Sequence, residues 1–251
     1  MEEQTSKVKS LAKALHVLEC FQNDRPELGV TEIARMLDLQ KSTVHNIVST
    51  YEDLGYLRQN QETGKYQLGV KLLQFSYIIN NHMGFRKFFL PYLQEIANKV
   101  NEIVYFGIPH EGDVLYIDSQ VPAGTMAARN ILGEHAPMYC TGLGKAMLAF
   151  LPVETRERFM DRPLTPFTEN TITTREALRA DLEQIRMRGY SIDNMEHEYG
   201  VTCLALPIFG ADRRVVGAVS VSAPSLRFTE DVLRRNAQII REILAPAQYV
   251  L

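Results

Sequence analysis

Two serines near the C-terminal end of the chain could contact a polar ligand. Side chains alternate faces along a predicted strand at residues 215–222, so Ser220 and Ser222 share one face of an otherwise apolar run. Hydroxyl groups on an apolar face cost free energy unless a partner satisfies them. The pattern therefore predicts either a polar ligand or hydrogen bonds within the sheet at these two positions.

Four further residues could complete such a site. The segment Thr-Gly-Leu-Gly-Lys at 141–145 precedes a predicted helix, where the N–H groups of Gly142 and Leu143 favour an anion. Cys203 opens the neighbouring strand, and Asp193 lies upstream of it. We predict a pocket in which the N–H groups and serines hold a carboxylate, Asp193 accepts from a ligand hydroxyl and Cys203 packs beside it. Ordinary roles in a helix cap, a turn and a sheet remain the alternative.

A second polar face lies in the N-terminal third. A helix beginning near residue 40 has Val44, Ile47, Val48, Tyr51 and Leu54 at helical spacing. Its opposite face carries short donors and acceptors that can contact base edges, and its first residues suit a phosphate. The candidate DNA-binding residues are Gln40, Lys41, Ser42, Thr43, His45, Asn46 and Ser49, with Thr31 on the preceding helix and Arg58 and Lys65 on a following hairpin.

The elements that position this face are three helices and the hairpin. We expect Ser10 and Thr31 to cap the first two helices, Asp38 to lie in the turn before the third, and Gly55 to end it. The inward residues are predicted to be Leu11, Leu15, Leu18 and Phe21 in the first helix and Ile33, Ala34 and Leu37 in the second. With strands at 56–60 and 65–68, this order is typical of a winged helix-turn-helix.

The remainder divides into a connector and a larger domain. Residues 70–81 predict a helix that is apolar nearly all round, which favours packing against a second copy of itself. Beyond it we expect strands at 103–108, 114–117, 203–209 and 215–222 and helices at 88–100, 145–150, 176–188 and 230–244. The predicted class is α+β, with a DNA-binding domain at 1–69, a linker helix at 70–84 and an effector-binding and oligomerisation domain at 85–251.

Composition limits the alternatives. The net charge is −3, so DNA binding would depend on local charge placement rather than on an overall basic balance. No membrane span or secretory signal is expected, since the start is acidic and no long apolar run occurs. Three widely separated cysteines are typical of reduced cytoplasmic thiols, and the six histidines lack paired metal-ligand spacing, so we expect no metal and no cofactor.

Two other functions stay open at this point. Cys203, His197 and Asp193 could suggest a thiol hydrolase, although no acylation motif surrounds the cysteine. The winged helix could instead bind only protein, which a salt titration with duplex DNA would separate from DNA binding. The glycine run before Lys145 is not a P-loop, because it lacks the first glycine and the hydroxyl residue after the lysine.

Many short stretches in a fixed order resemble the IclR family of bacterial transcription regulators. They lie at residues 10–15, 31–34, 41–45, 54–56 and 66–69, and again at 141–146, 188–190, 200–205, 207–209 and 216–222. The resemblance implies a winged helix, a linker helix and an effector domain with a profilin- or GAF-like antiparallel sheet. It also implies homodimers or tetramers, and small organic acids bound where Gly142, Leu143, Asp193, Cys203, Ser220 and Ser222 stand here.

Two positions depart from the family's usual pattern. Asn46 stands where arginine is frequent, and asparagine favours adenine where arginine favours guanine, so no operator sequence carries over. Asp38 stands where the turn often has glycine, and aspartate tolerates the left-handed conformation better than most residues. The expected function is a cytoplasmic, ligand-responsive regulator of a catabolic operon, with repression favoured over activation and double-stranded DNA and a small carboxylate as partners.

Overall fold

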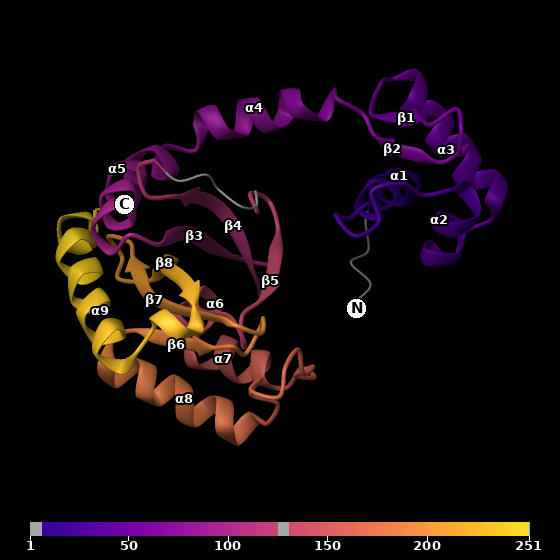
Figure 1. Ribbon diagram of the computed structural model, residues 1–251. Coiled ribbons are helices and arrows are strands. Elements are labelled where there is room, and N and C mark those ends of the chain that lie inside the picture. The colour runs from indigo at the N-terminus through magenta and orange to yellow at the C-terminus, as the bar shows by residue number, and fades with distance from the viewer. Residues whose placement is uncertain (1–6, 125–130, 251) are drawn as a thin grey trace. The chain divides into compact units, whose positions relative to one another are not determined.

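The computed structural model describes residues 7–124 and 131–250 (Figure 1). The chain divides into two compact units, with the boundary in the sequence between Met83 and Gly84. The acidic start of the chain, on which the expectation of no secretory signal was based, lies outside the described residues. Among the helices within those ranges, none is long and apolar enough to cross a bilayer.

Three helices and a two-stranded antiparallel sheet form most of the N-terminal unit. The elements are α1 (Lys9–Glu19), α2 (Val30–Leu37), α3 (Lys41–Asp53), β1 (Leu57–Gln59) and β2 (Tyr66–Leu68). Their apolar faces meet in one core, to which α2 gives Ile33, α3 gives Val44 and Val48, and the hairpin gives Leu57 and Tyr66. The predicted winged helix-turn-helix layout is confirmed.

Local details in this unit correct several predictions. Ser10 lies inside α1, which starts at Lys9 after Val8. Thr31 does not cap α2, because the helix already starts at Val30 and the carboxylate of Glu32 accepts from the N–H of Gly29 at 2.7 Å. The turn before α3 is as expected, since Asp38 has a φ of 52°. The predicted inward residues Leu11, Leu15 and Leu54 are instead 57%, 48% and 51% exposed.

Helix α4 (Leu72–His82) closes the N-terminal unit and begins two residues later than predicted. None of its residues is buried. The apolar side chains Val70, Leu73, Phe75, Tyr77, Ile78 and Ile79, on or just before α4, are between 47% and 82% exposed. Within the unit, Phe75 stacks on Tyr56 with ring centroids 6.0 Å apart.

A six-stranded antiparallel sheet is the centre of the C-terminal unit. Its order is β5-β4-β3-β8-β7-β6, formed by β3 (Ile103–His110), β4 (Asp113–Gln120), β5 (His135–Pro137), β6 (Ser191–Asn194), β7 (Val201–Phe209) and β8 (Val215–Pro224). The predicted α+β class with a central antiparallel sheet is confirmed. The short strands β5 and β6 were not predicted, because three or four residues carry too little alternation to recognise.

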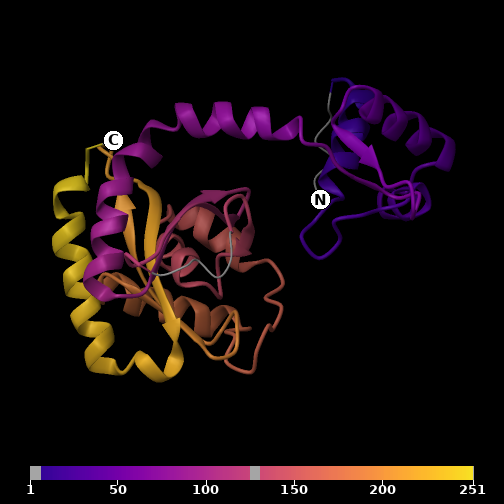
Figure 2. The same cartoon turned by 45° about the horizontal axis from the view of Figure 1, so that its top comes forward.

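Helices cover both faces of this sheet. Helices α5 (Gly84–Val100) and α9 (Glu230–Leu244) lie side by side against one face, as Figure 2 shows. Helix α6 (Gly142–Leu148) packs on the other face, and α8 (Arg175–Arg188) packs outside it. Helix α7 (Val153–Met160) was not predicted. The helix predicted at 145–150 starts three residues earlier, and the one predicted at 88–100 starts at Gly84.

Candidate functional site

The register of three adjacent strands places the two predicted serines beside their predicted neighbours. Ser222 pairs with Ile103 on one side and Cys203 on the other, and Ser220 pairs with Tyr105 of β3. The thiol of Cys203 and the hydroxyl of Ser222 are 2.9 Å apart. One face of the central strands therefore presents a row of hydroxyl, thiol and aromatic groups.

A cavity of about 500 Å³ lies over this row. All six residues predicted to bind a ligand line it, namely Gly142, Leu143, Asp193, Cys203, Ser220 and Ser222. They come from α6, β6, β7 and β8, which are far apart in the sequence. This volume falls in the range of small-molecule sites, which are concave and combine apolar walls with a few placed polar groups.

The start of α6 supplies backbone donors at one end of the cavity. Thr141 caps the helix, and its hydroxyl accepts from the N–H of Gly144 at 3.2 Å. The N–H groups of Gly142 and Leu143, in the first turn, have no acceptor within the helix. A side chain at position 142 would place its Cβ 3.1 Å from the Cβ of Cys203, so glycine allows α6 to approach β7 closely.

Burial changes the acid–base properties of the cavity. Asp193 is only 4% exposed. Burial raises the pKa of its carboxyl to about 7, against the opposing hydrogen bond from the N–H of Glu196 at 2.8 Å. Burial also raises the pKa of Tyr116 and of Cys203 well above their ordinary values. The phenol and the thiol are therefore neutral donors at neutral pH.

Several lining residues were missed by the sequence reasoning. Tyr105 and Tyr116 face the cavity from β3 and β4, with ring centroids 5.8 Å apart, and Glu134, His135 and Glu198 are further polar lining residues. The alternation of β3 could have identified Tyr105 once the register against β8 was known. The loop residues at 134 and 198 follow no periodic pattern, so no signal in the sequence singled them out.

The thiol hydrolase alternative does not fit this geometry. A nucleophilic cysteine needs a depressed pKa and a base that takes its proton. Here burial and the charge of Asp193 raise the pKa of Cys203, and its near neighbour is the hydroxyl of Ser222. Within the described ranges, no three histidine, cysteine, aspartate or glutamate side chains are grouped to hold a metal ion.

The N-terminal unit presents the predicted DNA face on α3. Lys41, Ser42, His45 and Asn46 are all exposed, and Gln40 precedes the helix in extended conformation. Beside them, Thr43 is half-buried. A face of this kind, at the start of the second helix of a helix-turn-helix, has the position from which recognition helices contact the major groove.

Three other predicted contact residues have partners inside the unit. Lys65 forms an ion pair with Glu32 at 3.0 Å, so its charge is partly neutralised. Ser49 is half-buried and its hydroxyl bonds the phenol of Tyr66. Arg58 is exposed on β1 and contacts the side chain of Gln67 at 3.3 Å. Thr31 is exposed on α2.

A winged helix-turn-helix, joined in one chain to a domain with a polar cavity, defines the class of ligand-responsive DNA-binding regulators. The chain matches the models "IclR helix-turn-helix domain" over residues 10–61 and "Bacterial transcriptional regulator IclR C-terminal" over residues 78–247. The chain belongs to the IclR family of bacterial transcriptional regulators, as the sequence resemblance implied. It is a transcriptional regulator with a helix-turn-helix and an effector domain, and not an enzyme.

Curated relatives and solved structures agree with this assignment. The HTH-type transcriptional regulator XynR of Escherichia coli is 32% identical, over 88% of this chain and 88% of the relative. The transcriptional repressor IclR of Escherichia coli is 30% identical, over 94% of this chain and 88% of its own length. The crystal structure of an IclR homologue from Microbacterium hydrocarbonoxydans, complexed with 4-hydroxybenzoate, has a TM-score of 0.75 and 26% identity, covering 95% of this chain and all of that one.

Proposed function

We propose that this regulator is a repressor of a catabolic operon and that a small organic carboxylate bound in the 500 Å³ cavity changes its affinity for operator DNA. The observation that carries the proposal is the convergence of Gly142, Leu143, Asp193, Cys203, Ser220 and Ser222 on one cavity. Those residues were chosen from sequence by strand parity, helix-start chemistry and family resemblance. The two related proteins named as a repressor and as a 4-hydroxybenzoate complex support the repressor role and the acidic effector.

The chemistry of the lining favours an acid with a short apolar body. The N–H groups at the start of α6 and the hydroxyls of Ser220 and Ser222 supply donors for a carboxylate. Leu143, Tyr105 and Tyr116 supply apolar and aromatic contact area for the remainder of the ligand. Asp193 accepts from a hydroxyl of the ligand when it is ionised.

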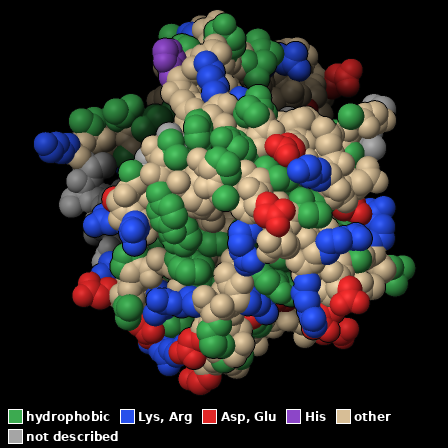
Figure 3. Space-filling view, turned by 90° about the vertical axis from the view of Figure 1, so that its left-hand side faces the viewer, with side chains coloured by type: hydrophobic (Ala, Val, Ile, Leu, Met, Phe, Trp, Pro, Cys, Tyr) green, Lys and Arg blue, Asp and Glu red, His purple; other side chains and the backbone are tan. Residues whose placement is uncertain are grey.

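The DNA-binding part of the proposal rests on α3. We assign His45 and Asn46 to base edges and Lys41, Ser42 and Thr43 to phosphates, with Gln40, Ser49, Thr31, Arg58 and Lys65 as peripheral contacts. The positive ends of peptide groups at the helix start add to the single lysine there. Because the chain has a net charge of −3, DNA binding depends on this local surface rather than on an overall basic balance. On the face shown in Figure 3, basic and acidic side chains are interspersed.

Dimerisation through residues 70–84 completes the proposal. Leu73 is 67% and Tyr77 is 71% exposed, and an exposed apolar helix of this kind is stable in water only when another surface covers it. We propose that α4 of a second copy covers it, so that two winged helices contact two half-sites of an operator.

The test is a thermal-shift screen of the full-length protein against metabolite acids that include pyruvate, gluconate and 4-hydroxybenzoate. An acid at a hundred times its dissociation constant stabilises the native state by about 2.7 kcal/mol, which raises the melting temperature by several degrees. The double variant Ser220→Ala with Ser222→Ala should lose this shift and retain DNA binding. Thr173→Ala, which removes an exposed hydroxyl outside the cavity, is the matched control and should respond like the wild type. A normal response in the double variant would show that the cavity is misassigned.

A further inference from the structure

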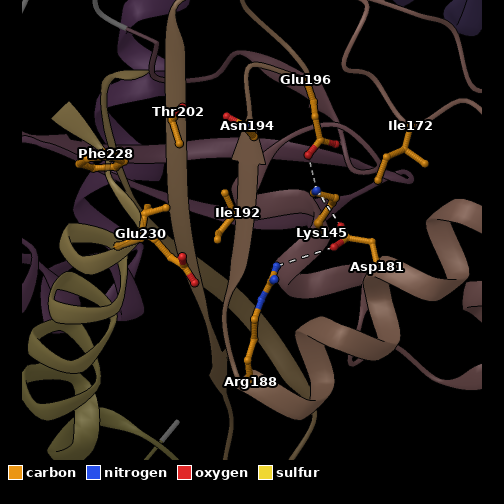
Figure 4. A pocket seen from close by; sticks show the side chains of 11 residues that line it. Lys145, Ile172, Asp181, Arg188, Ile192, Asn194, Glu196, Thr202, Phe228 and Glu230 are labelled. Carbon is orange, nitrogen blue, oxygen red and sulfur yellow. Dashed lines mark hydrogen bonds and ion pairs between the residues drawn. The ribbon is translucent and has the colours of Figure 1, made fainter. Parts of the chain in front are cut away.

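A lysine is buried beside the effector cavity. Lys145 lies on α6 and is 1% exposed, yet its ammonium group contacts two carboxylates (Figure 4). It lies 2.7 Å from Oδ2 of Asp181, on α8, and 2.5 Å from Oε1 of Glu196, in the loop after β6. A buried charge is tolerated only when paired, and removing one partner of such a pair is costly. The cluster Lys145–Asp181–Glu196 therefore constrains the three segments that meet in it.

Two of these segments are walls of the effector cavity. Lys145 lies in the same turn of α6 as Gly142 and Leu143, so its position fixes the part of α6 that lines the cavity. Glu196 donates its backbone N–H to Oδ1 of Asp193 at 2.8 Å. The ion pair between Lys145 and Glu196 thus connects the proposed carboxylate-binding wall to the wall that carries Asp193.

The end of β6 and the loop after it, residues 193–198, are held by polar contacts. Met195 has a φ of 58°, a conformation that side chains rarely adopt. Hydroxyl groups fix the backbone on both sides of this point: Thr168 donates to the carbonyl of Met195 at 2.6 Å, and Thr171 donates to that of Glu196 at 2.6 Å. The shape of this wall therefore depends on a few directed bonds, of which the pair with Lys145 is the charged one.

Residues of the loop divide between two cavities. Asp193, His197 and Glu198 line the effector cavity, whereas Asn194 and Glu196 line a second cavity of about 460 Å³ (Figure 4). In the second cavity Lys145 pairs with Asp181 and with Oε1 of Glu196, whereas Oε2 of Glu196 is buried without a hydrogen-bond partner among the described residues.

We propose that Lys145 is a positioning residue for the effector site, and that its ion pair with Glu196 keeps the end of β6, which carries Asp193, in register with the start of α6. This inference rests on the proposed effector cavity and adds how that cavity is held in shape. Asp181 pairs with the same lysine but belongs to α8, outside the effector cavity, so its bond anchors Lys145 without joining the two walls.

The experiment compares Glu196→Gln with Asp181→Asn in the full-length protein by hydrogen–deuterium exchange and mass spectrometry. Each substitution removes one negative charge from Lys145 and keeps the side-chain shape. Asp181→Asn also weakens the ion pair of Asp181 with Arg188 at 3.7 Å, which lies on α8 away from the effector cavity. A hydrogen bond to a charged group stabilises a structure more than one between neutral groups. Weakening it in Glu196→Gln should therefore speed the exchange of backbone amides over residues 191–200 about tenfold. Asp181→Asn should leave exchange there within about twofold of the wild type.

Equal acceleration at 191–200 in both variants, or none in Glu196→Gln, would overturn the proposal. A purely structural role of the cluster predicts the first of these results, with similar losses in melting temperature. Should Glu196→Gln fold poorly, Glu196→Asp keeps the charge but shortens its reach, and the same local exchange is expected. The exchange needs no effector, so it is independent of whether any acid binds. Where an acid does bind, Glu196→Gln should weaken its affinity about tenfold and Asp181→Asn should not.

Discussion

Replacing Asp193 by asparagine should remove its part of a loss of stability that sets in as the pH rises. The carboxyl has a pKa of about 7 in the folded chain, against an ordinary value of 3.8, because it is buried. The folded state therefore retains a proton that the unfolded state releases, and the free energy of unfolding falls as the pH rises between these two values. At about 1.4 kcal/mol per unit of pKa, the loss reaches at most about 4 kcal/mol above pH 7.

Asparagine has nearly the same shape and its oxygen can still accept the N–H of Glu196, but it carries no titrating proton. We expect the variant to match the wild type near pH 3, below both pKa values, and to exceed it by several kcal/mol at pH 8. The assay is urea unfolding of both proteins, followed by circular dichroism, at half-unit steps of pH. Asp212→Asn, at an exposed loop position, is the control and should leave the pH profile unchanged.

Parallel profiles of the Asp193→Asn variant and the wild type would refute the reasoning. They would mean that the cavity hydrates the carboxylate well enough to ionise it at its ordinary pKa. Glu196, whose pKa burial also raises, still titrates in the variant, so part of the pH dependence remains in both proteins.

Three further predictions concern the other parts of the molecule. His45→Ala should weaken binding to specific DNA by about 1–3 kcal/mol in a fluorescence anisotropy titration while sparing non-specific binding, and equal losses would make it a phosphate contact. Gly144→Ala should destabilise the C-terminal unit in thermal melts, since the new Cβ would lie 2.3 Å from the Cα of Met138; an unchanged melting temperature would contradict this. Leu73→Glu with Tyr77→Glu should shift the protein from dimer to monomer in sedimentation velocity at micromolar concentration, and an undiminished dimer would place the interface elsewhere.

Periodic patterns in the sequence predicted the fold wherever an element was long and regular. Helix α9 begins and ends at the predicted residues, and the hairpin of β7 and β8 agrees to within two residues at each end. The helix starts were harder to predict, because they depend on which side chain accepts from the N–H groups near the start of the helix. Glu32 bonds back to Gly29, which moves the start of α2 ahead of Thr31.

The exposed leucines Leu11 and Leu15 show a second limit. Helical spacing identifies an apolar stripe but does not say which stripe faces the core, and in α1 the buried residue is Val17. The spacing of residues also did not predict that Lys145 is buried and paired, since its partners Asp181 and Glu196 are distant in sequence. Only the three-dimensional arrangement shows that a lysine in the glycine-rich helix start is fully buried and paired.

The predicted cavity residues had a stronger basis, because strand parity and family resemblance selected the same set. Parity placed Ser220 and Ser222 on one face, and the register with β7 places Cys203 beside Ser222. The tyrosines Tyr105 and Tyr116 were not predicted, as their approach to the cavity depends on which strands pair across the sheet.

The most direct test of the central claim measures the affinity of the full-length protein for DNA from its own upstream region. Anisotropy titrations would be run with and without the acid that gives the largest thermal shift. The account predicts a change in affinity of at least about fivefold, the low end of coupling between two sites, in the wild type and none in Ser220→Ala with Ser222→Ala. An acid that binds the wild type tightly but leaves its DNA affinity unaltered would contradict it.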